Sequence, residues 1–276
     1  MNTSKLVSLQ ILASMIKDGD SLGLGGSLLH RGPFALVREL IRSGRRHLEI
    51  IKASPGYDID ILCRAGSVAK ARCGIVAMEG QFGFAPWYRK AVENGVLELE
   101  EHACATLAAG LRAAAFGVPF QPVAGVHGSD IAKLNNWACI SDPYGSGKDC
   151  WVIPPIRPDI AVIHAAEATL AGDVRVYGTP HWDRLLTRAA KCVLVTTERL
   201  VDEALFAERP EWTLVPRFMT DAVAVVPRGA WPGSCLPFYG VDFQGIESYL
   251  ANPGEDFLRT HLQNAPETRP EDASMD

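Results

Sequence analysis

The sequence predicts an α/β domain built on an open, mostly parallel sheet flanked by helices. Short apolar segments of strand length alternate with longer segments in which apolar residues recur at helical spacing, and this alternation is typical of parallel sheets. The 276 residues are 47% hydrophobic and 21% charged, which suits a globular domain with a sizeable core. A glycine-rich turn joins the first predicted strand to the helix that follows it.

The elements can be assigned in chain order. Residues 4–17 predict an amphipathic helix that Gly19 ends, and a second helix begins at Gly32-Pro33 and ends at Gly44. Further helices are predicted over residues 59–65, 86–94, 103–116, 181–190, 198–208 and 242–251. The predicted strands are residues 21–25, 48–53, 71–78, 96–100, 160–164, 173–177, 192–196 and 222–226.

Two segments fall outside this alternation. Residues 141–158 are rich in glycine and proline and predict a long surface excursion rather than a linker between domains. Residues 263–276 carry two prolines, four acidic residues and almost nothing apolar, so we expect a disordered tail there. The folded domain should therefore span residues 1–262.

Charge and composition exclude several classes of function. The formal net charge is −5, and no basic cluster is longer than Arg45-Arg46, so we expect binding neither to nucleic acid nor to a membrane. No segment approaches the roughly 18 apolar residues of a membrane span, and none resembles a secretion signal, which predicts a cytoplasmic protein. The seven cysteines form no Cys-x-x-Cys pair, so neither disulfides nor a metal site are expected.

The stretch from Asp18 to Pro33 carries the clearest functional signal. A strand ends in a run of glycines that includes Gly25-Gly26, and a helix then begins at Pro33. A strand, a glycine turn and a helix start can together present backbone N–H groups to an anion or to a developing oxyanion. Turns that need a positive φ angle use the same residues, so a structural role is the alternative.

Other nucleotide-binding and catalytic motifs are incomplete. A dinucleotide-binding loop would need a glycine where Leu28 stands and an acidic residue at positions 53–54. Residues 145–148 resemble part of a P-loop, but Asp142 and Asp149 replace its first glycine and its magnesium-binding hydroxyl residue. The chain has no Gly-x-Ser-x-Gly elbow and no His-Glu-x-x-His motif, which leaves hydrolases of those two types without support.

The stretch from Asp18 to Pro33 resembles the glycine signature of family I coenzyme A transferases. The residues that match the signature in place are Asp18, Gly19, Gly25, Gly26 and Pro33. Ser27 and Arg31 depart from it in a way that is similar to α subunits of the glutaconate CoA-transferase type. Shorter matches extend over residues 5–255, so the resemblance implies the open α/β fold of this family.

The resemblance also implies a reaction and a partner. Such an α subunit pairs with a homologous β subunit in an α2β2 or larger hetero-oligomer, with the active site at their junction. In the β subunit, the glutamate of a Ser-Glu-Asn-Gly motif attacks an acyl-CoA and then carries CoA as a glutamyl thioester to a small carboxylic acid. Coenzyme A would be a substrate rather than a bound cofactor. Gly25, Gly26 and Ser27 would form the loop that faces the oxyanion.

Two positions bear on the type of reaction. Val92-Glu93-Asn94-Gly95 nearly matches the nucleophile motif, but we interpret Glu93 as the end of a helix that Asn-Gly stops. Steroid-ring-opening CoA hydrolases resemble this chain and carry a catalytic glutamate where Cys104 stands. The apolar neighbours of Cys104 favour a buried structural thiol. Ala124 replaces an arginine that is usual in the family, so recognition of a carboxylate by that arginine is unsupported.

Four residues are candidate contacts to CoA or to a substrate carboxylate. His30 and Arg31 lie at the tip of the glycine loop, where they could bind an anion through charge-assisted hydrogen bonds. Glu101 follows a predicted strand, where it either caps the next helix or faces the cleft, and Cys104 lies near the start of that helix. A CoA-dependent hydrolase of the same fold and a noncatalytic ligand-binding module are the two alternatives to a CoA-transferase.

Overall fold

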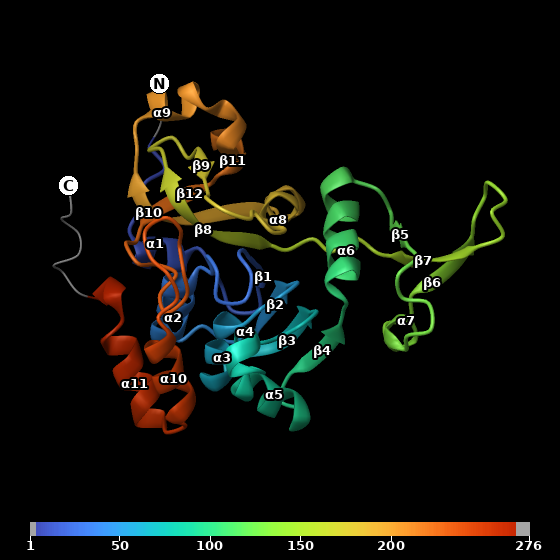
Figure 1. Cartoon of the computed structure of the whole chain (residues 1–276), viewed down its shortest axis with the longest axis horizontal. Helices are drawn as coiled ribbons and strands as arrows, with labels where there is room; N and C mark the ends of the chain where they lie inside the picture. Colours follow the sequence, from blue (N-terminus) through green and yellow to red (C-terminus); the bar gives the residue numbers. More distant parts are fainter. Residues whose placement is uncertain (1–3, 269–276) are drawn as a thin grey trace.

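The computed structural model of the chain describes residues 4–268 and shows an open sheet with helices on both faces (Figure 1). Its parallel strands lie in the order β4–β3–β2–β1–β8–β10–β12. Their bounds are β1 (Ser21–Leu24), β2 (Leu48–Lys52), β3 (Val68–Cys73), β4 (Glu98–Glu101), β8 (Ile160–Ala168), β10 (Cys192–Leu200) and β12 (Ala222–Val225). The short strands β9 (Val174–Arg175) and β11 (Thr213–Val215) extend the end of β8 in antiparallel fashion. The predicted α/β class with a mostly parallel sheet is confirmed.

Alternation along the strands divides the core between the two faces of the sheet. In β2, Ile50 belongs to one apolar cluster and Ile51 to the other, because successive side chains of a strand point to opposite faces. The first cluster packs under α1 (Leu9–Ser14), α2 (Phe34–Arg42), α3 (Tyr57–Arg64), α5 (Pro86–Glu93), α10 (Phe243–Ala251) and α11 (Glu255–Gln263). The second packs under α6 (Cys104–Phe116) and α8 (Asp183–Ala189).

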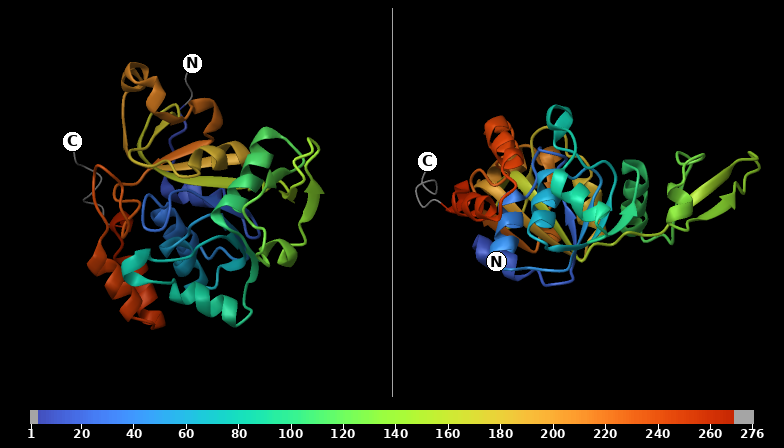
Figure 2. Two further views of the ribbon diagram at one scale, coloured as in Figure 1. Left: turned by 45° about the vertical axis from the view of Figure 1, so that its right-hand side comes forward. Right: turned by 90° about the horizontal axis from the view of Figure 1, so that it is seen from below.

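Residues 117–155, called the arm here, project from the body beyond α6 (Figures 1 and 2). The arm contains a three-stranded antiparallel sheet in the order β5–β7–β6 and the short helix α7. The bounds are β5 (Gln121–Val123), α7 (Ile131–Leu134), β6 (Ala138–Ser141) and β7 (Asp149–Ile153). Most of the surface excursion expected at 141–158 belongs to this arm, but it also contains the strand β7, which the sequence pattern does not predict. Periodicity alone does not predict this strand because glycines and prolines border β7 and mark the segment as a loop.

Several predicted boundaries are wrong for local reasons. The helix expected from residue 4 begins only at Leu9, because residues 5–7 run beside β12 and bond to Val223. The Ser8 side chain then caps the helix by accepting from the N–H of Ile11. The helix expected at 198–208 is shortened to α9 (Glu203–Glu208), since β10 continues to Leu200. The strand expected at 71–78 lies earlier, at β3.

The described end of the chain packs against α2, so the boundary expected after residue 262 is drawn too early. Residues 266–268 form a turn of 3-10 helix, and Glu267 forms ion pairs with Arg38 and Arg42. Both Arg38 and Glu267 are buried, and a buried arginine needs such a carboxylate. The rest of the expected tail, residues 269–276, lies outside the described residues. No helix within the described range is long and apolar enough to span a membrane.

Candidate functional site

The glycine loop leaves the carboxyl end of β1 and lies beside the loops that leave β2 and β3. The N–H of Leu28 donates to the carbonyl of Ser54 at 2.8 Å, which joins the first loop to the second. The N–H groups of Gly74 and Ala77 donate to Ala53 and Pro55, which joins the second loop to the third. Three consecutive strand ends thus form one connected rim, the usual place for a ligand in an open parallel sheet.

The backbone N–H groups of the glycine loop are already bonded within the chain. Gly25 donates to the carbonyl of Val162 at 2.8 Å, and Gly26 donates to Asp183 Oδ1 at 2.9 Å. Ser27 donates to the carbonyl of His30 at 3.0 Å. The expectation that these three residues supply oxyanion donors is therefore corrected: in this conformation their N–H groups hold the loop in shape.

Gly26 is required by the turn itself. Its φ angle is +70°, and a Cβ there would meet the backbone of His30 and lie 2.6 Å from the carbonyl carbon of Arg31. No other residue type fits both conditions. The structural interpretation of this glycine, one of the two given from the sequence, is the one that the geometry supports.

Arg31 is not available to a ligand, contrary to the sequence-based expectation. Its side chain is 4% exposed, and its guanidinium bonds to Asp183 Oδ2 at 2.8 Å and to the carbonyl of Thr179 at 2.7 Å. Asp183 therefore joins Arg31 and the N–H of Gly26 from the start of α8. This ion pair fixes the loop, and removing either partner would leave a buried charge without compensation.

His30, in contrast, faces outward from the rim with a side chain that is 49% exposed. Its Nδ1 lies 2.6 Å from Ser234 Oγ, and its Nε2 lies 3.4 Å from Glu79 Oε1. Glu79 follows β3 and has a φ angle of +64°, a strained value for a residue with a side chain. Glu79 is not among the residues that the sequence predicts for the site, and its one signal there is an acidic residue directly after a predicted strand.

A second histidine and a buried lysine lie near this rim. Burial and the charge of Arg31 lower the pKa of His181 below its usual value. His181 also has a positive φ angle, of 46°. Lys52, at the end of β2, is buried and pairs with Asp58 at 2.6 Å. A small cavity beneath the rim is lined by Lys52, Gly26 and Trp182 among others.

Cys104 lies at the rim and Glu101 beside it, at the two sides of the turn between β4 and α6. Cys104 is the first residue of α6 and is half-buried, with its Sγ 3.4 Å from Ser54 Oγ and from the carbonyl of Ala53. Glu101 is exposed at the end of β4. The neighbouring Glu100, in contrast, has a partner. Its hydrogen bond with His102 lowers the pKa of the Glu100 carboxyl to about 2.

Glu93 is the last residue of α5, at the end of a helix as the sequence predicts. Asn94 caps the helix, Gly95 has a φ angle of +63°, and the Glu93 side chain is 59% exposed and pairs with Arg89 at 2.7 Å. This glutamate belongs to a solvated helix end.

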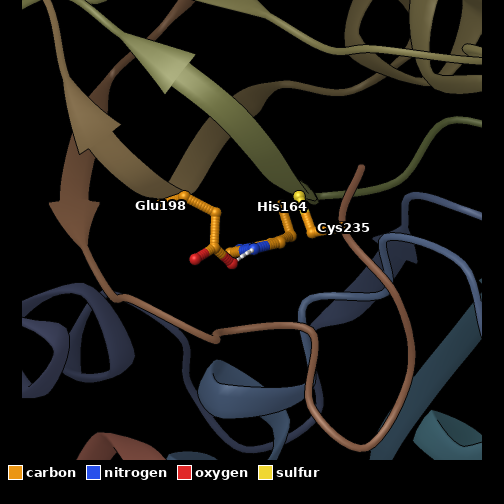
Figure 3. Close-up of side chains that lie close together, drawn as sticks. All are labelled: His164, Glu198 and Cys235. Carbon is orange, nitrogen blue, oxygen red and sulfur yellow. Dashed lines mark hydrogen bonds and ion pairs between the residues drawn. The ribbon is translucent and has the colours of Figure 1, made fainter. Parts of the chain in front are cut away.

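Behind the rim, a buried polar network fixes the segment that carries Ser234. Figure 3 shows His164 and Glu198 pointing at each other, with Cys235 beside them; His164 Nε2 lies 2.7 Å from Glu198 Oε1. The three side chains could hold a metal ion by distance, since their ligand atoms lie within 4.8 Å of one another. The Glu198 carboxylate, however, already accepts from Tyr239 and from the N–H groups of residues 228 and 229. Burial also raises the pKa of the Cys235 thiol to about 12, so a hydrogen-bond network describes this cluster better than a metal centre.

The fold defines the chain as an α/β protein whose rim lies at the carboxyl edge of a parallel sheet, where open α/β folds usually bind ligands. A family model described as Coenzyme A transferase matches residues 7–225. The chain therefore belongs to the coenzyme A transferase family, a family of transferase enzymes, as the glycine signature predicts.

Three relatives illustrate the similarity. The chain is 34% identical to a 3-oxoadipate CoA-transferase subunit of Pseudomonas knackmussii over 248 residues, which cover 88% of this chain and 86% of that protein. It is 33% identical to the cholesterol ring-cleaving hydrolase IpdA subunit of Rhodococcus jostii, over 95% of this chain and 93% of that one. It also spans 54% of an uncharacterized protein of Archaeoglobus fulgidus, with 34% identity.

Two solved structures share the architecture. Glutaconate CoA-transferase of Acidaminococcus fermentans superposes with a TM-score of 0.88 at 27% identity and covers 96% of this chain and 89% of that chain. A single-residue variant of the decarboxylase AibA/AibB gives 0.86 at 31% identity and covers 96% and 100%. The relatives thus include transferases, a hydrolase and a decarboxylase, so the fold alone does not decide the reaction.

Proposed function

We propose that this chain is the α subunit of a heteromeric CoA-transferase that moves CoA from an acyl-CoA to a small carboxylic acid. A glutamate of a homologous β subunit would form the glutamyl-CoA intermediate, and coenzyme A would act as a substrate. Membership of the coenzyme A transferase family supports the reaction, and relatives that are themselves named as subunits support the need for a partner.

The observation that carries the proposal is the state of the carboxylates around the rim. Asp183 is bound to Arg31 and to a backbone N–H, and Asp58 is bound to Lys52, so neither is free to attack a thioester. Glu79 is 28% exposed, and its Oε1 contacts the His30 imidazole. Because two of these carboxylates are paired and Glu79 is engaged at one oxygen, the proposal assigns the nucleophilic carboxylate to a second subunit placed against the rim.

The arm supports the presence of that second chain. It exposes large apolar side chains, among them Leu134 at 68% and Tyr144 at 96%. Five of the 39 residues of the arm are charged, which is a smaller fraction than the 21% of the whole chain. Depletion of charged residues is typical of the cores of protein interfaces. A groove of about 750 Å³ lies between the arm and the edge strand β4, which leaves room for a partner beside Glu98 and Glu100.

The experiment is reconstitution with a homologous chain that carries Ser-Glu-Asn-Gly. We expect transfer of CoA from acyl-CoA to an added acid only when both chains are present. Intact-mass measurement after incubation with acyl-CoA should show the added mass of CoA on the partner and none on this chain. Transfer by the isolated chain, or CoA mass on this chain, would refute the proposal.

A further inference from the structure

Glu79 and His30 form a carboxylate–imidazole pair whose parts are oriented by different elements. Ser234 holds the Nδ1 side of the His30 ring at 2.6 Å, which turns Nε2 toward Glu79 Oε1. The N–H of Leu29 also approaches Oε1, at 3.4 Å. Both contacts fall on the same oxygen, and the described part of the chain offers Oε2 no hydrogen-bond donor. The pair therefore presents one engaged oxygen and one oxygen able to accept a proton.

The backbone of Glu79 argues against a purely structural role for this side chain. Its φ angle of +64° is one that glycine adopts freely and a glutamate does not. The two contacts of Oε1 are both 3.4 Å long and therefore weak, so the side chain itself does little to hold the strained backbone. Strained residues of this kind cluster at functional sites, where the strain holds a group in place.

We propose that Glu79 is a general base for water and that His30 is its positioning residue, so that the rim hydrolyses CoA thioesters in addition to transferring CoA. The inference rests on the proposed function only in that acyl-CoA binds at this rim. The inference differs from the proposed function in the group that reacts, which is Glu79 of this chain, and in the acceptor, which is water in place of a carboxylic acid.

The step balances with water as the one co-reactant. Glu79 Oε2 takes a proton from a water molecule as the water oxygen bonds to the thioester carbonyl carbon. The carbon–sulfur bond then breaks, and the CoA thiolate leaves and takes that same proton from Glu79. The products are the free carboxylic acid and the CoA thiol, and Glu79 is again a carboxylate. His30 holds Oε1 and keeps Oε2 directed at the water.

The test measures release of the CoA thiol by the two-chain complex from acetyl-CoA and from glutaryl-CoA, without an acceptor acid. We expect Glu79→Gln to slow release about a hundredfold or more, the scale of one general base, and to slow transfer to an added acid by a much smaller factor, so that the ratio of release to transfer falls. His30→Asn should lower kcat for release by a smaller factor with KM unchanged. Glu93→Gln, a matched change at an exposed glutamate of α5, should leave release as in the wild type.

Stability measurements separate this role from a structural one. Glu79→Gln keeps the backbone strain and should melt within a few degrees of the wild type, whereas Glu79→Gly should melt higher because glycine relieves the strain. Release by Glu79→Gln at the wild-type rate, no release by the wild type from either thioester, or a lower melting temperature for Glu79→Gly would each overturn the inference. Release that depends on Glu79 without any transfer would refute the proposed function alone.

Discussion

Replacing Glu267 with glutamine should destabilise the whole domain, although this residue lies only nine positions from the end of the chain. Arg38 is fully buried, and its Nε and Nη2 donate to the two oxygens of Glu267 at 2.6 Å each. Arg42 adds a third bond, of 2.8 Å. Glutamine keeps the shape of the side chain but leaves the Arg38 charge buried without a counter-charge, which costs about 3–5 kcal/mol.

Urea denaturation of the two proteins at pH 7 provides the assay. The free energy of unfolding should fall by that amount, with an unchanged dependence on urea concentration. The double variant Arg38→Met with Glu267→Met should recover much of the loss, because it removes both charges and fills the volume with apolar atoms. A loss of less than about 1 kcal/mol in Glu267→Gln would show that water or another group reaches Arg38, and would refute the reasoning.

The same ion pair predicts a pH dependence. Burial raises the pKa of the Glu267 carboxyl, but the charge of Arg38 and the hydrogen bonds from both arginines outweigh it, so the pKa lies below its usual value of 4.5. A carboxyl whose pKa is lowered by folding stabilises the protein above the unfolded pKa and loses that contribution as the pH falls through the folded pKa. The difference between wild type and Glu267→Gln should therefore be constant at neutral pH and shrink only below about pH 4.5.

Three further substitutions test the rim. Gly26→Ala should lower the free energy of unfolding by about 2 kcal/mol or more, because a Cβ would meet the backbone of His30 and the φ angle is positive; a melting temperature equal to the wild type would contradict this. Glu93→Ala should change unfolding by less than about 0.5 kcal/mol and leave transfer by the complex intact, as expected for an exposed helix end. Cys104→Ser should retain transfer within threefold; a collapse of the rate in a folded complex would make the thiol a catalytic group.

Local patterns predicted the fold well and the site only in part. The alternation of strand and helix fixes the class, and the glycine signature marks the loop that lies at the rim. The roles of Arg31 and Glu267 could not be read in the same way, because their partners lie 152 and 229 residues away along the chain. Seen in the sequence alone, Arg31 has the features of a ligand contact, and only the fold brings Asp183 against it. The position of Glu79 cannot be predicted because a positive φ angle on a glutamate leaves no mark in the sequence.

The pairing of Arg38 with Glu267 also bears on how the chain is made. Arg38 emerges from the ribosome 229 residues before Glu267 does. β1 lies between β2 and β8, so the centre of the sheet cannot close before residues 160–162 have emerged. The nascent chain must therefore keep a charged side chain and an open strand edge solvated until these distant partners have emerged, and it completes its core only after Glu267 is available. A chain terminated before Glu267 would lack the counter-charge of Arg38. Its domain would be less stable and more readily degraded by cellular proteases.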